Sequence, residues 1–215
     1  MKPVIRNKIE NYFSQYDVKT YAKGEIITLA NQAPAGISLL VSGVVEQYDI
    51  STEGNKITLN IYKPPAFFPM SWAINQTPNS YFFGAITKVT LRQADPAATV
   101  QFLRANPDVL FDLLSRVYTG TDILMRRLAL AASGIAVNRL LYELLIEAYR
   151  FGVPATADQT VITIRQNTLA ARSGLARETI SRELHKLEKH NLLALSKEGI
   201  TINIAKLEAA LNLIA

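Results

Sequence analysis

Cysteine is absent from the 215-residue sequence, and histidine occurs only as His185 and His190. Without cysteine the chain forms no disulfide and cannot hold an iron–sulfur cluster through thiolates. Both histidines lie in the last third of the chain, in the segment that is interpreted below as a helix-turn-helix, so we do not expect a haem or zinc sensor built on histidine. We also find no motif of a catalytic nucleophile, a metal-dependent hydrolase or a phosphate-binding glycine loop. We therefore expect no catalytic residue, no metal ligand and no cofactor.

Long apolar runs are also missing from the sequence. No run reaches the roughly 18 residues that a membrane span needs, and the N-terminal stretch MKPVIRNKIENYF lacks the apolar core of a signal peptide. We expect a cytoplasmic protein that does not contact a membrane. Its net charge of +5 is a mild basic excess, which suits a nucleic-acid partner without requiring one.

Short β-rich runs occupy residues 18–98, after a short amphipathic helix predicted over 1–16. The runs fall at 24–30, 36–50, 55–62 and 85–94, and the turn Thr52-Glu53-Gly54-Asn55 separates two alternating segments as in a hairpin. Strands at this spacing predict a small antiparallel roll or barrel.

A long helix is predicted from Pro107 to about residue 132, because Asn106-Pro107-Asp108 has the composition of a helix start. Apolar residues recur along it with spacings of 4 and 3, which is a heptad pattern that favours pairing with an identical helix. The alternative is a helix that packs on its own β-roll. The dimerisation candidates are Leu110, Leu114, Val117, Thr121, Leu124 and Leu128, followed by Ala131.

Ser133-Gly134 interrupts this helix, and a second one is predicted over 135–152. Residues 153–160 (VPATADQT) read as a loop that leads into the last part of the chain. A short helix closes the sequence at 205–215.

A helix-turn-helix is predicted where RQNTLAARSGL is followed by ARETISRELHKLEK. Gly174 suits the left-handed residue that ends a first helix. In the second helix Ile180, Leu184 and Leu187 form a buried stripe, so that Glu178, Ser181 and Arg182 point outward. Two short strands around Lys197-Glu198-Gly199 would add a wing, and the second helix of such a motif enters the major groove of DNA.

The segment Arg177-Glu178-Thr179-Ile180-Ser181-Arg182 resembles the recognition helix of the cyclic-AMP receptor protein and fumarate-nitrate regulator (CRP/FNR) superfamily. The resemblance covers essentially the whole chain and is strongest over 162–204. Ala176 departs from it, because many relatives have a serine cap there, and the loss costs the helix about 1 kcal/mol.

Specific contacts follow from the chemistry of this helix, since arginine can donate two hydrogen bonds to guanine and glutamate can accept one from cytosine. We expect Arg177 and Arg182 to read guanines, Glu178 a cytosine, and Ser181 a thymine or a phosphate. Lys186 and Lys189 are either phosphate contacts or solvated charges. The resemblance implies a half-site with a TGA-like core.

Charged residues are absent between Lys63 and Lys88. Relatives that bind cyclic AMP use a Gly-Glu pair and an Arg-Ser or Arg-Thr pair for the ribose and the cyclic phosphate. By alignment these positions read Pro69-Met70 and Asn79-Ser80 here, so the resemblance implies that the nucleotide-binding chemistry is missing.

Two interpretations of this uncharged segment stay open. Its aromatic side chains fill the interior, or they surround an apolar or aromatic effector that Asn75, Gln76, Asn79 or Ser80 would orient. The candidate pocket residues are Phe67, Phe68, Met70, Trp72, Asn79, Ser80 and Phe82.

The predicted fold is α+β, with a cyclic-nucleotide-binding-like β-roll over 1–106, a dimerisation helix over 107–133 and a winged helix-turn-helix over 134–215. The predicted function is a sequence-specific transcription regulator that binds an inverted-repeat operator as a homodimer and is not controlled by cyclic AMP. RNA polymerase is a further candidate partner. The alternatives are an effector-gated regulator and a module that binds protein rather than DNA.

Overall fold

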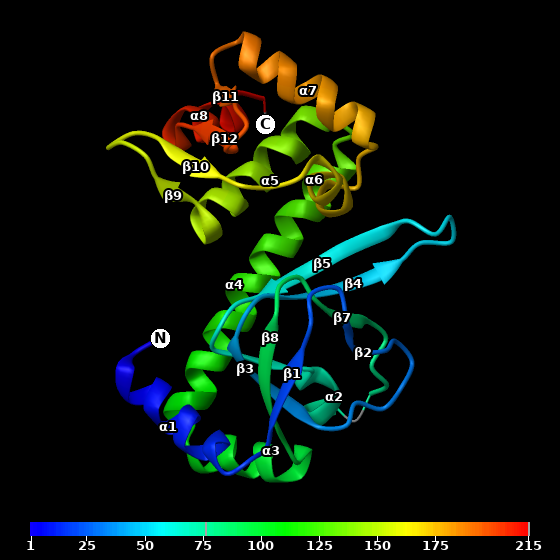
Figure 1. Ribbon diagram of the computed structural model, residues 1–215, viewed down its shortest axis with the longest axis vertical. Coiled ribbons are helices and arrows are strands. Elements are labelled where there is room, and N and C mark those ends of the chain that lie inside the picture. The colour runs from blue at the N-terminus through cyan, green and yellow to red at the C-terminus, as the bar shows by residue number, and fades with distance from the viewer. Residues whose placement is uncertain (76, 215) are drawn as a thin grey trace. The chain divides into compact units, whose positions relative to one another are not determined.

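Two compact units make up the chain, Met1–Asp122 and Ile123–Ala215. The structure is a computed structural model that describes residues 1–75 and 77–214, with side chains described up to Leu211 (Figure 1). We expected the central helix to be a segment of its own. The division between the two units falls inside that helix, α4 (Pro107–Ala132), and its role as a separate dimerisation segment stays a prediction.

The described strands of the first unit form two four-stranded sheets, and both are antiparallel, as the predicted antiparallel roll requires. One has the order β1-β8-β3-β6 and the other β2-β7-β4-β5. The strands are β1 (Val18–Tyr21), β2 (Ile26–Thr28), β3 (Ile37–Ser42), β4 (Val45–Ile50), β5 (Lys56–Tyr62), β6 (Ala66–Phe68), β7 (Phe82–Ala85) and β8 (Val89–Ala94).

The β4–β5 hairpin confirms the predicted turn. Ser51 N donates to Asn55 O and Gly54 N donates to Ser51 O, while Val45 pairs with Tyr62 at the far end of the ladder. Because successive side chains of a strand point to opposite faces, Leu39 and Leu40 of β3 enter two different clusters.

Helices cover one of these clusters. Ile9 and Phe13 of α1 (Pro3–Ser14) pack with Leu103 of α3 (Pro96–Ala105) and with Val109 and Leu113 of α4. Helix α1 was predicted. Helix α3 was not, nor was α2 (Met70–Asn75), although Asp95 before Pro96 is a helix-start signal: its Oδ1 accepts a hydrogen bond from Ala98 N.

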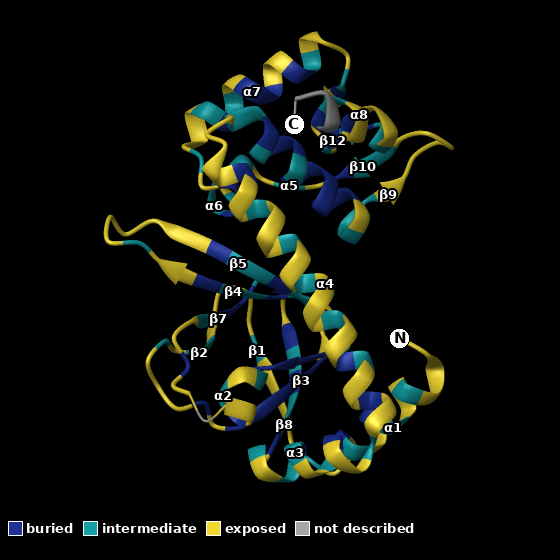
Figure 2. Cartoon of the chain, turned by 180° about the vertical axis from the view of Figure 1, so that it is seen from behind, coloured by how far each residue is buried: buried dark blue, intermediate teal, exposed yellow. Residues whose placement is uncertain are grey.

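Helix α4 begins and ends where the heptad pattern predicts. Much of α4 is exposed within the chain (Figure 2). The predicted leucine and valine residues of the seam are 40% exposed at Leu110 and up to 65% exposed at Leu128. Phe111, Tyr118 and Met125, seven residues apart, are also more than 60% exposed. The helix therefore buries Val109 and Leu113 within the chain and leaves a wider apolar face uncovered.

The second unit contains α5 (Ala136–Phe151), α6 (Gln166–Ser173), α7 (Arg177–Lys189) and α8 (Ile204–Ile214) around one core that includes Leu141, Leu169 and Ile180. Gly134, at φ 74°, lies in the predicted break between α4 and α5. The sheet of the second unit has the strand order β11-β12-β10-β9. Its strands are β9 (Val153–Pro154), β10 (Thr160–Ile162), β11 (Leu193–Leu195) and β12 (Ile200–Ile202).

The prediction of a plain loop over 153–160 was wrong. Val153 and Pro154 pair with Val161 and Thr160, so that this segment is a β9–β10 hairpin at the edge of the sheet. Proline is tolerated at a sheet edge, where its missing N–H faces no partner strand. Within the described residues, none of the helices combines the length and the apolar content needed to span a bilayer.

Candidate nucleic-acid interface

The turn between α6 and α7 is built on Gly174. Its backbone has φ 64° and ψ 29°, and its N–H donates to Ala170 O. An added Cβ would meet no neighbouring atom there, so glycine is favoured by the left-handed backbone alone and not by crowding. Ala176 then caps α7 without a side-chain hydrogen bond, as expected from its missing hydroxyl.

The inward face of α7 is the predicted one. Ile180, Leu184 and Leu187 are each less than 5% exposed and join the core of the unit. This packing fixes the rotation of the helix about its axis and therefore decides which residues face solvent.

The outward face of α7 brings together the residues predicted to read DNA. Arg177, Glu178, Ser181 and Arg182 line a shallow surface hollow of about 400 Å³ together with His185 and with Gln166 of α6. Basic, acidic and hydroxyl groups on one exposed helical face can donate to and accept from base edges. Gln166 was not predicted, and its position at the start of α6 is the signal that could have indicated it.

Lys186 lies beside this face and is tied to an acidic neighbour. Its Nζ donates to Glu183 Oε1 at 2.9 Å, and Arg182 Nε donates to the same oxygen at 3.3 Å. These contacts lower the pKa of Glu183, with the Lys186 hydrogen bond the largest cause. Glu183 is a second functional candidate that sequence reasoning missed, and its position three residues after Ile180 and four before Leu187, at the edge of the buried stripe, is the signal that could have indicated it.

The wing predicted around Lys197-Glu198-Gly199 is present as the β11–β12 hairpin. Ser196 N donates to Gly199 O, and Leu195 pairs with Ile200. A Cβ at Gly199 would lie 2.4 Å from Ile162 O of the neighbouring strand, so this glycine is required by close backbone approach.

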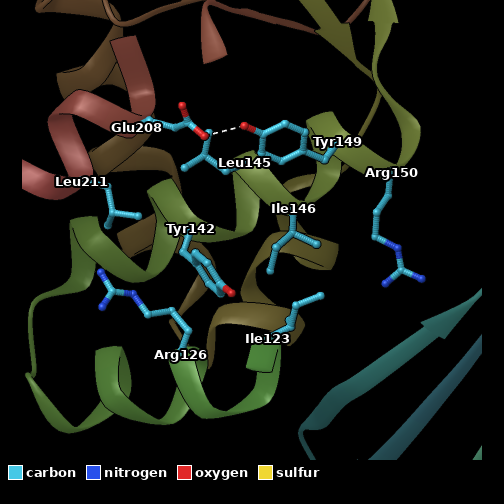
Figure 3. Close-up of a pocket in the computed structure, with 9 residues that line it drawn as sticks. All are labelled: Ile123, Arg126, Tyr142, Leu145, Ile146, Tyr149, Arg150, Glu208 and Leu211. Atoms are coloured by element: carbon cyan, nitrogen blue, oxygen red, sulfur yellow. Dashed lines mark hydrogen bonds between the residues drawn. The ribbon is translucent and has the colours of Figure 1, made fainter. Parts of the chain in front are cut away.

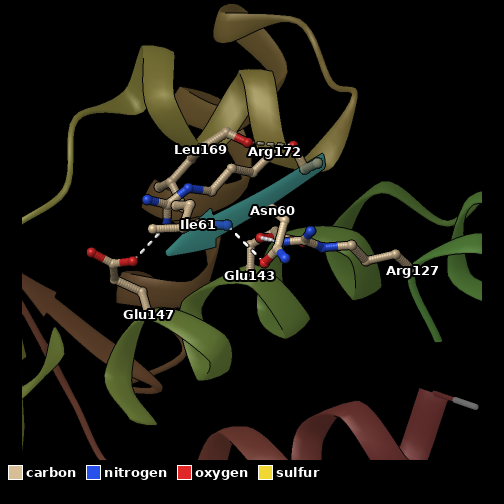
Figure 4. A network of polar contacts seen from close by, with 8 residues as sticks. Asn60, Ile61, Arg127, Glu143, Glu147, Leu169 and Arg172 are labelled. Carbon is tan, nitrogen blue, oxygen red and sulfur yellow. Dashed lines mark hydrogen bonds and ion pairs between the residues drawn. The ribbon is translucent and has the colours of Figure 1, made fainter. Parts of the chain in front are cut away.

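Two ion pairs join α6 and the end of α4 to α5, and the first of them, Arg127–Glu143, is partly buried while the second, Arg172–Glu147, is buried (Figure 4). Arg127 donates from Nε and Nη2 to both oxygens of Glu143, at 2.6 and 2.8 Å. Arg172 donates to Glu147, and both of these side chains are about 5% exposed. Burial raises the pKa of Glu143, an effect that the Arg127 contact opposes.

A second hollow of the same unit, of about 540 Å³, lies among α4, α5 and α8 (Figure 3). Its floor is apolar, with Leu145, Ile146 and Leu211 buried, and Tyr149 donates from its hydroxyl to Glu208 at the rim. The hydrogen bond to this carboxylate raises the pKa of Tyr149.

The predicted effector-pocket residues do not gather around one cavity. Phe67, with Met70 and Trp72, joins the helix-covered cluster, whereas Phe68 stacks on Phe83 between the sheets at a centroid distance of 5.0 Å. The reason is strand alternation, since Phe67 and Phe68 are consecutive in β6. Phe67 and Phe68 therefore fill two separate interiors.

The polar residues that were expected to orient an effector either form hydrogen bonds within the chain or are exposed. Asn79 is buried and donates from Nδ2 to Leu29 O and Tyr81 O, so that both amide hydrogens are used within the chain. Ser80 is exposed, and Phe82 stacks on Tyr48. Gln76 lies outside the described residues. Among the described residues, no group of three or more histidine, cysteine, aspartate or glutamate side chains could hold a metal ion.

Two family models match the chain. The model of the cyclic nucleotide-binding domain matches residues 18–106, and the model of the Crp-like helix-turn-helix domain matches residues 137–210. Global nitrogen regulators from Synechocystis sp. and Nostoc sp. are each 25% identical to the chain over 193 residues. The aligned region covers 86% of this chain and 84% and 85% of these relatives.

Solved structures share the fold at low sequence identity. A mutant of CooA from Carboxydothermus hydrogenoformans has a TM-score of 0.78 at 18% identity, covering 94% of this chain and 90% of that one. The c-di-GMP responsive global regulator CLP of Xanthomonas campestris has a TM-score of 0.77 at 16% identity, covering 92% and 98%. A transcriptional regulator of the CRP/FNR family from Thermus thermophilus has a TM-score of 0.72 at 21% identity, covering 91% and 98%.

Proposed function

We propose that this chain, which belongs to the CRP/FNR type of DNA-binding transcription regulators, binds an inverted-repeat operator as a homodimer and reads each half-site with α7. The observation that carries the proposal is the gathering of Arg177, Glu178, Ser181 and Arg182 on one exposed face of α7. Arg177 and Arg182 donate to guanines, Glu178 accepts from a cytosine, and Ser181 contacts a thymine or a phosphate.

The proposed dimer forms along the exposed apolar face of α4. Leu114, Leu124 and Leu128 stay uncovered in the single chain, and burying them against a second copy is favourable. A twofold dimer presents two α7 helices, which requires an operator whose half-sites lie about one helical turn apart. Binding of RNA polymerase as a further partner stays a prediction.

Cyclic AMP does not control this protein under our proposal. A buried cyclic phosphate needs charge-assisted donors, and the two aligned positions carry Pro69-Met70 and Asn79-Ser80 instead. Asn79 already donates both amide hydrogens to backbone carbonyls. The filled interior around Phe67 and Phe68 favours a regulator that binds DNA without an effector in this segment.

The test is selection of bound DNA from a random duplex pool by the purified protein with no ligand added. We expect an inverted repeat with a TGA-like core. A folded dimer that selects no sequence would contradict the proposal of a ligand-free, binding-competent dimer. A single, non-repeated site would contradict the twofold arrangement.

Replacing Leu128 by glutamate is expected to convert the dimer to a monomer. The leucine is exposed within the chain, so its loss leaves the fold of the protomer intact, whereas the dimer loses two buried leucines and gains facing carboxylates. The dimer dissociation constant should rise at least about 100-fold. Sedimentation velocity measures this change.

Ala129→Glu is the matched control, because Ala129 is exposed on the same helix but lies outside the heptad seam. It should remain a dimer. If Leu128→Glu also sediments as a dimer at the same concentration, the interface lies elsewhere.

A further inference from the structure

Glu183 occupies an unusual place on α7. It follows Arg182, which has a side chain 61% exposed, yet Glu183 itself is only 7% exposed. Its Oε1 accepts a hydrogen bond from Lys186 Nζ at 2.9 Å and a second one from Arg182 Nε at 3.3 Å. One shielded carboxylate oxygen therefore holds two exposed cations.

The contact with Arg182 constrains how that arginine can meet a base. Consecutive residues of a helix do not face each other, so the Arg182 side chain has to bend around the helix surface for its Nε to reach Glu183. This contact engages Nε. The two terminal nitrogens have no hydrogen-bond partner within the described part of the chain, and together they can donate to O6 and N7 of one guanine.

The contact with Lys186 has a different consequence. Lysine neutralises a phosphate as a point charge, and a neighbouring carboxylate competes for that charge. At neutral pH this carboxylate is ionised, because Lys186 and Arg182 keep its pKa below the ordinary value. Glu183 therefore weakens the attraction of this part of α7 for any DNA backbone, whatever its sequence.

We propose that Glu183 is a positioning residue for base recognition, which presents the terminal nitrogens of Arg182 to a guanine and restrains Lys186 from non-specific phosphate contact. This inference rests on the proposed function, because it requires that Arg182 reads a base. It adds that selectivity depends on an acidic residue that touches no DNA.

The simplest rival explanation is an ordinary surface ion pair, which has little effect on anything but local stability. The two explanations differ in what they predict for binding. A purely structural pair would change the affinities for cognate and altered operators by the same factor. A positioning residue changes the ratio between them.

The experiment compares Glu183→Gln with the unchanged protein on three duplexes: the selected operator, the operator with the guanine of Arg182 replaced symmetrically, and unrelated DNA. Glutamine keeps the shape and removes the charge. We expect discrimination between the first two duplexes to fall about tenfold. Affinity for unrelated DNA should rise, and the slope of log K against log salt should steepen by about one per protomer.

Two variants act as controls. Glu208→Gln removes the same charge from α8, where Glu208 contacts Tyr149, and should leave discrimination unchanged. Glu183→Asp keeps the charge but shortens the side chain, so discrimination should fall without the steeper salt dependence. Thermal unfolding of each variant establishes that it is folded at the assay temperature.

A double mutant separates positioning from a general structural effect. When Arg182 is already alanine, Glu183→Gln should cause no further loss of discrimination. An equal loss in both backgrounds, or no loss in either, would overturn the positioning role. If Arg182→Ala itself leaves discrimination unchanged, Arg182 does not read a base. In that case the proposed function has failed, and the role of Glu183 fails with it.

Discussion

Arg182→Ala is expected to lower operator affinity roughly 30-fold to 10⁴-fold. One bidentate arginine–guanine contact contributes about 1–3 kcal/mol of discrimination, and a symmetric dimer loses two of them, with each 1.4 kcal/mol equal to a factor of ten. The side chain is exposed, so the loss should not come from unfolding. Titration of a labelled operator at fixed salt measures the change.

The base-pair positions at which Arg182→Ala loses sequence preference show whether this arginine contacts a base or a phosphate. If Arg182 reads a base, the variant should tolerate any base pair at one symmetric position of each half-site while keeping its preference elsewhere. Lys206→Ala provides the matched control, because it removes one positive charge from α8 of the same unit and should weaken binding only slightly and uniformly. A uniform loss for Arg182→Ala as well would reassign this arginine to the phosphate backbone.

Glu147→Ala is expected to destabilise the second unit by about 3–5 kcal/mol, because it leaves the buried guanidinium of Arg172 without its partner. The Nε atom of Arg172 is already buried without a hydrogen bond, and the nearby carboxylate of Glu143, which also attracts Arg172, already accepts two hydrogen bonds from Arg127. Urea unfolding measures the loss, and hydrogen exchange of the α5 and α6 amides assigns it to this unit.

Two comparisons make that prediction specific. Glu10→Ala removes an exposed ion pair with Arg6 in α1 and should change the free energy of unfolding by less than about 1 kcal/mol. Replacing Glu147 and Arg172 together by leucine should recover much of the loss, since two apolar groups need no ionic partner. If Glu147→Ala unfolds like the unchanged protein, the pair does not hold α6 on α5.

Local sequence signals identified the elements that carry the proposed reading of DNA. The spacing of Ile180, Leu184 and Leu187 gave the buried side of α7, and this alone placed Ser181 and Arg182 on the outside. Gly174 marked the end of α6 because few other residues adopt its backbone conformation. The heptad spacing gave α4 its length and its exposed seam.

Other features could not be predicted from a single segment, because the deciding contact is made with another strand. The stretch Val153–Pro154 becomes a strand only because it meets β10, and two residues carry no alternation of their own. For the aromatic residues near Phe67 the sequence left two interpretations open, a filled interior or an effector pocket. Strand β6 sends Phe67 and Phe68 to opposite faces, and only the packing of two sheets shows that these faces belong to different interiors.

Local sequence patterns were enough to predict the periodic and capped elements, the resemblance of α7 to a recognition helix and the lack of charged groups over 64–87, because each depends on residues within a few positions of one another. The pairing of Arg172 with Glu147, 25 residues away, and the shielding of Glu183 depend instead on tertiary packing. A buried charge is costly unless an oppositely charged or hydrogen-bonding group lies beside it. Whether a residue is buried depends on the packing of the whole unit and not on its neighbours in the sequence.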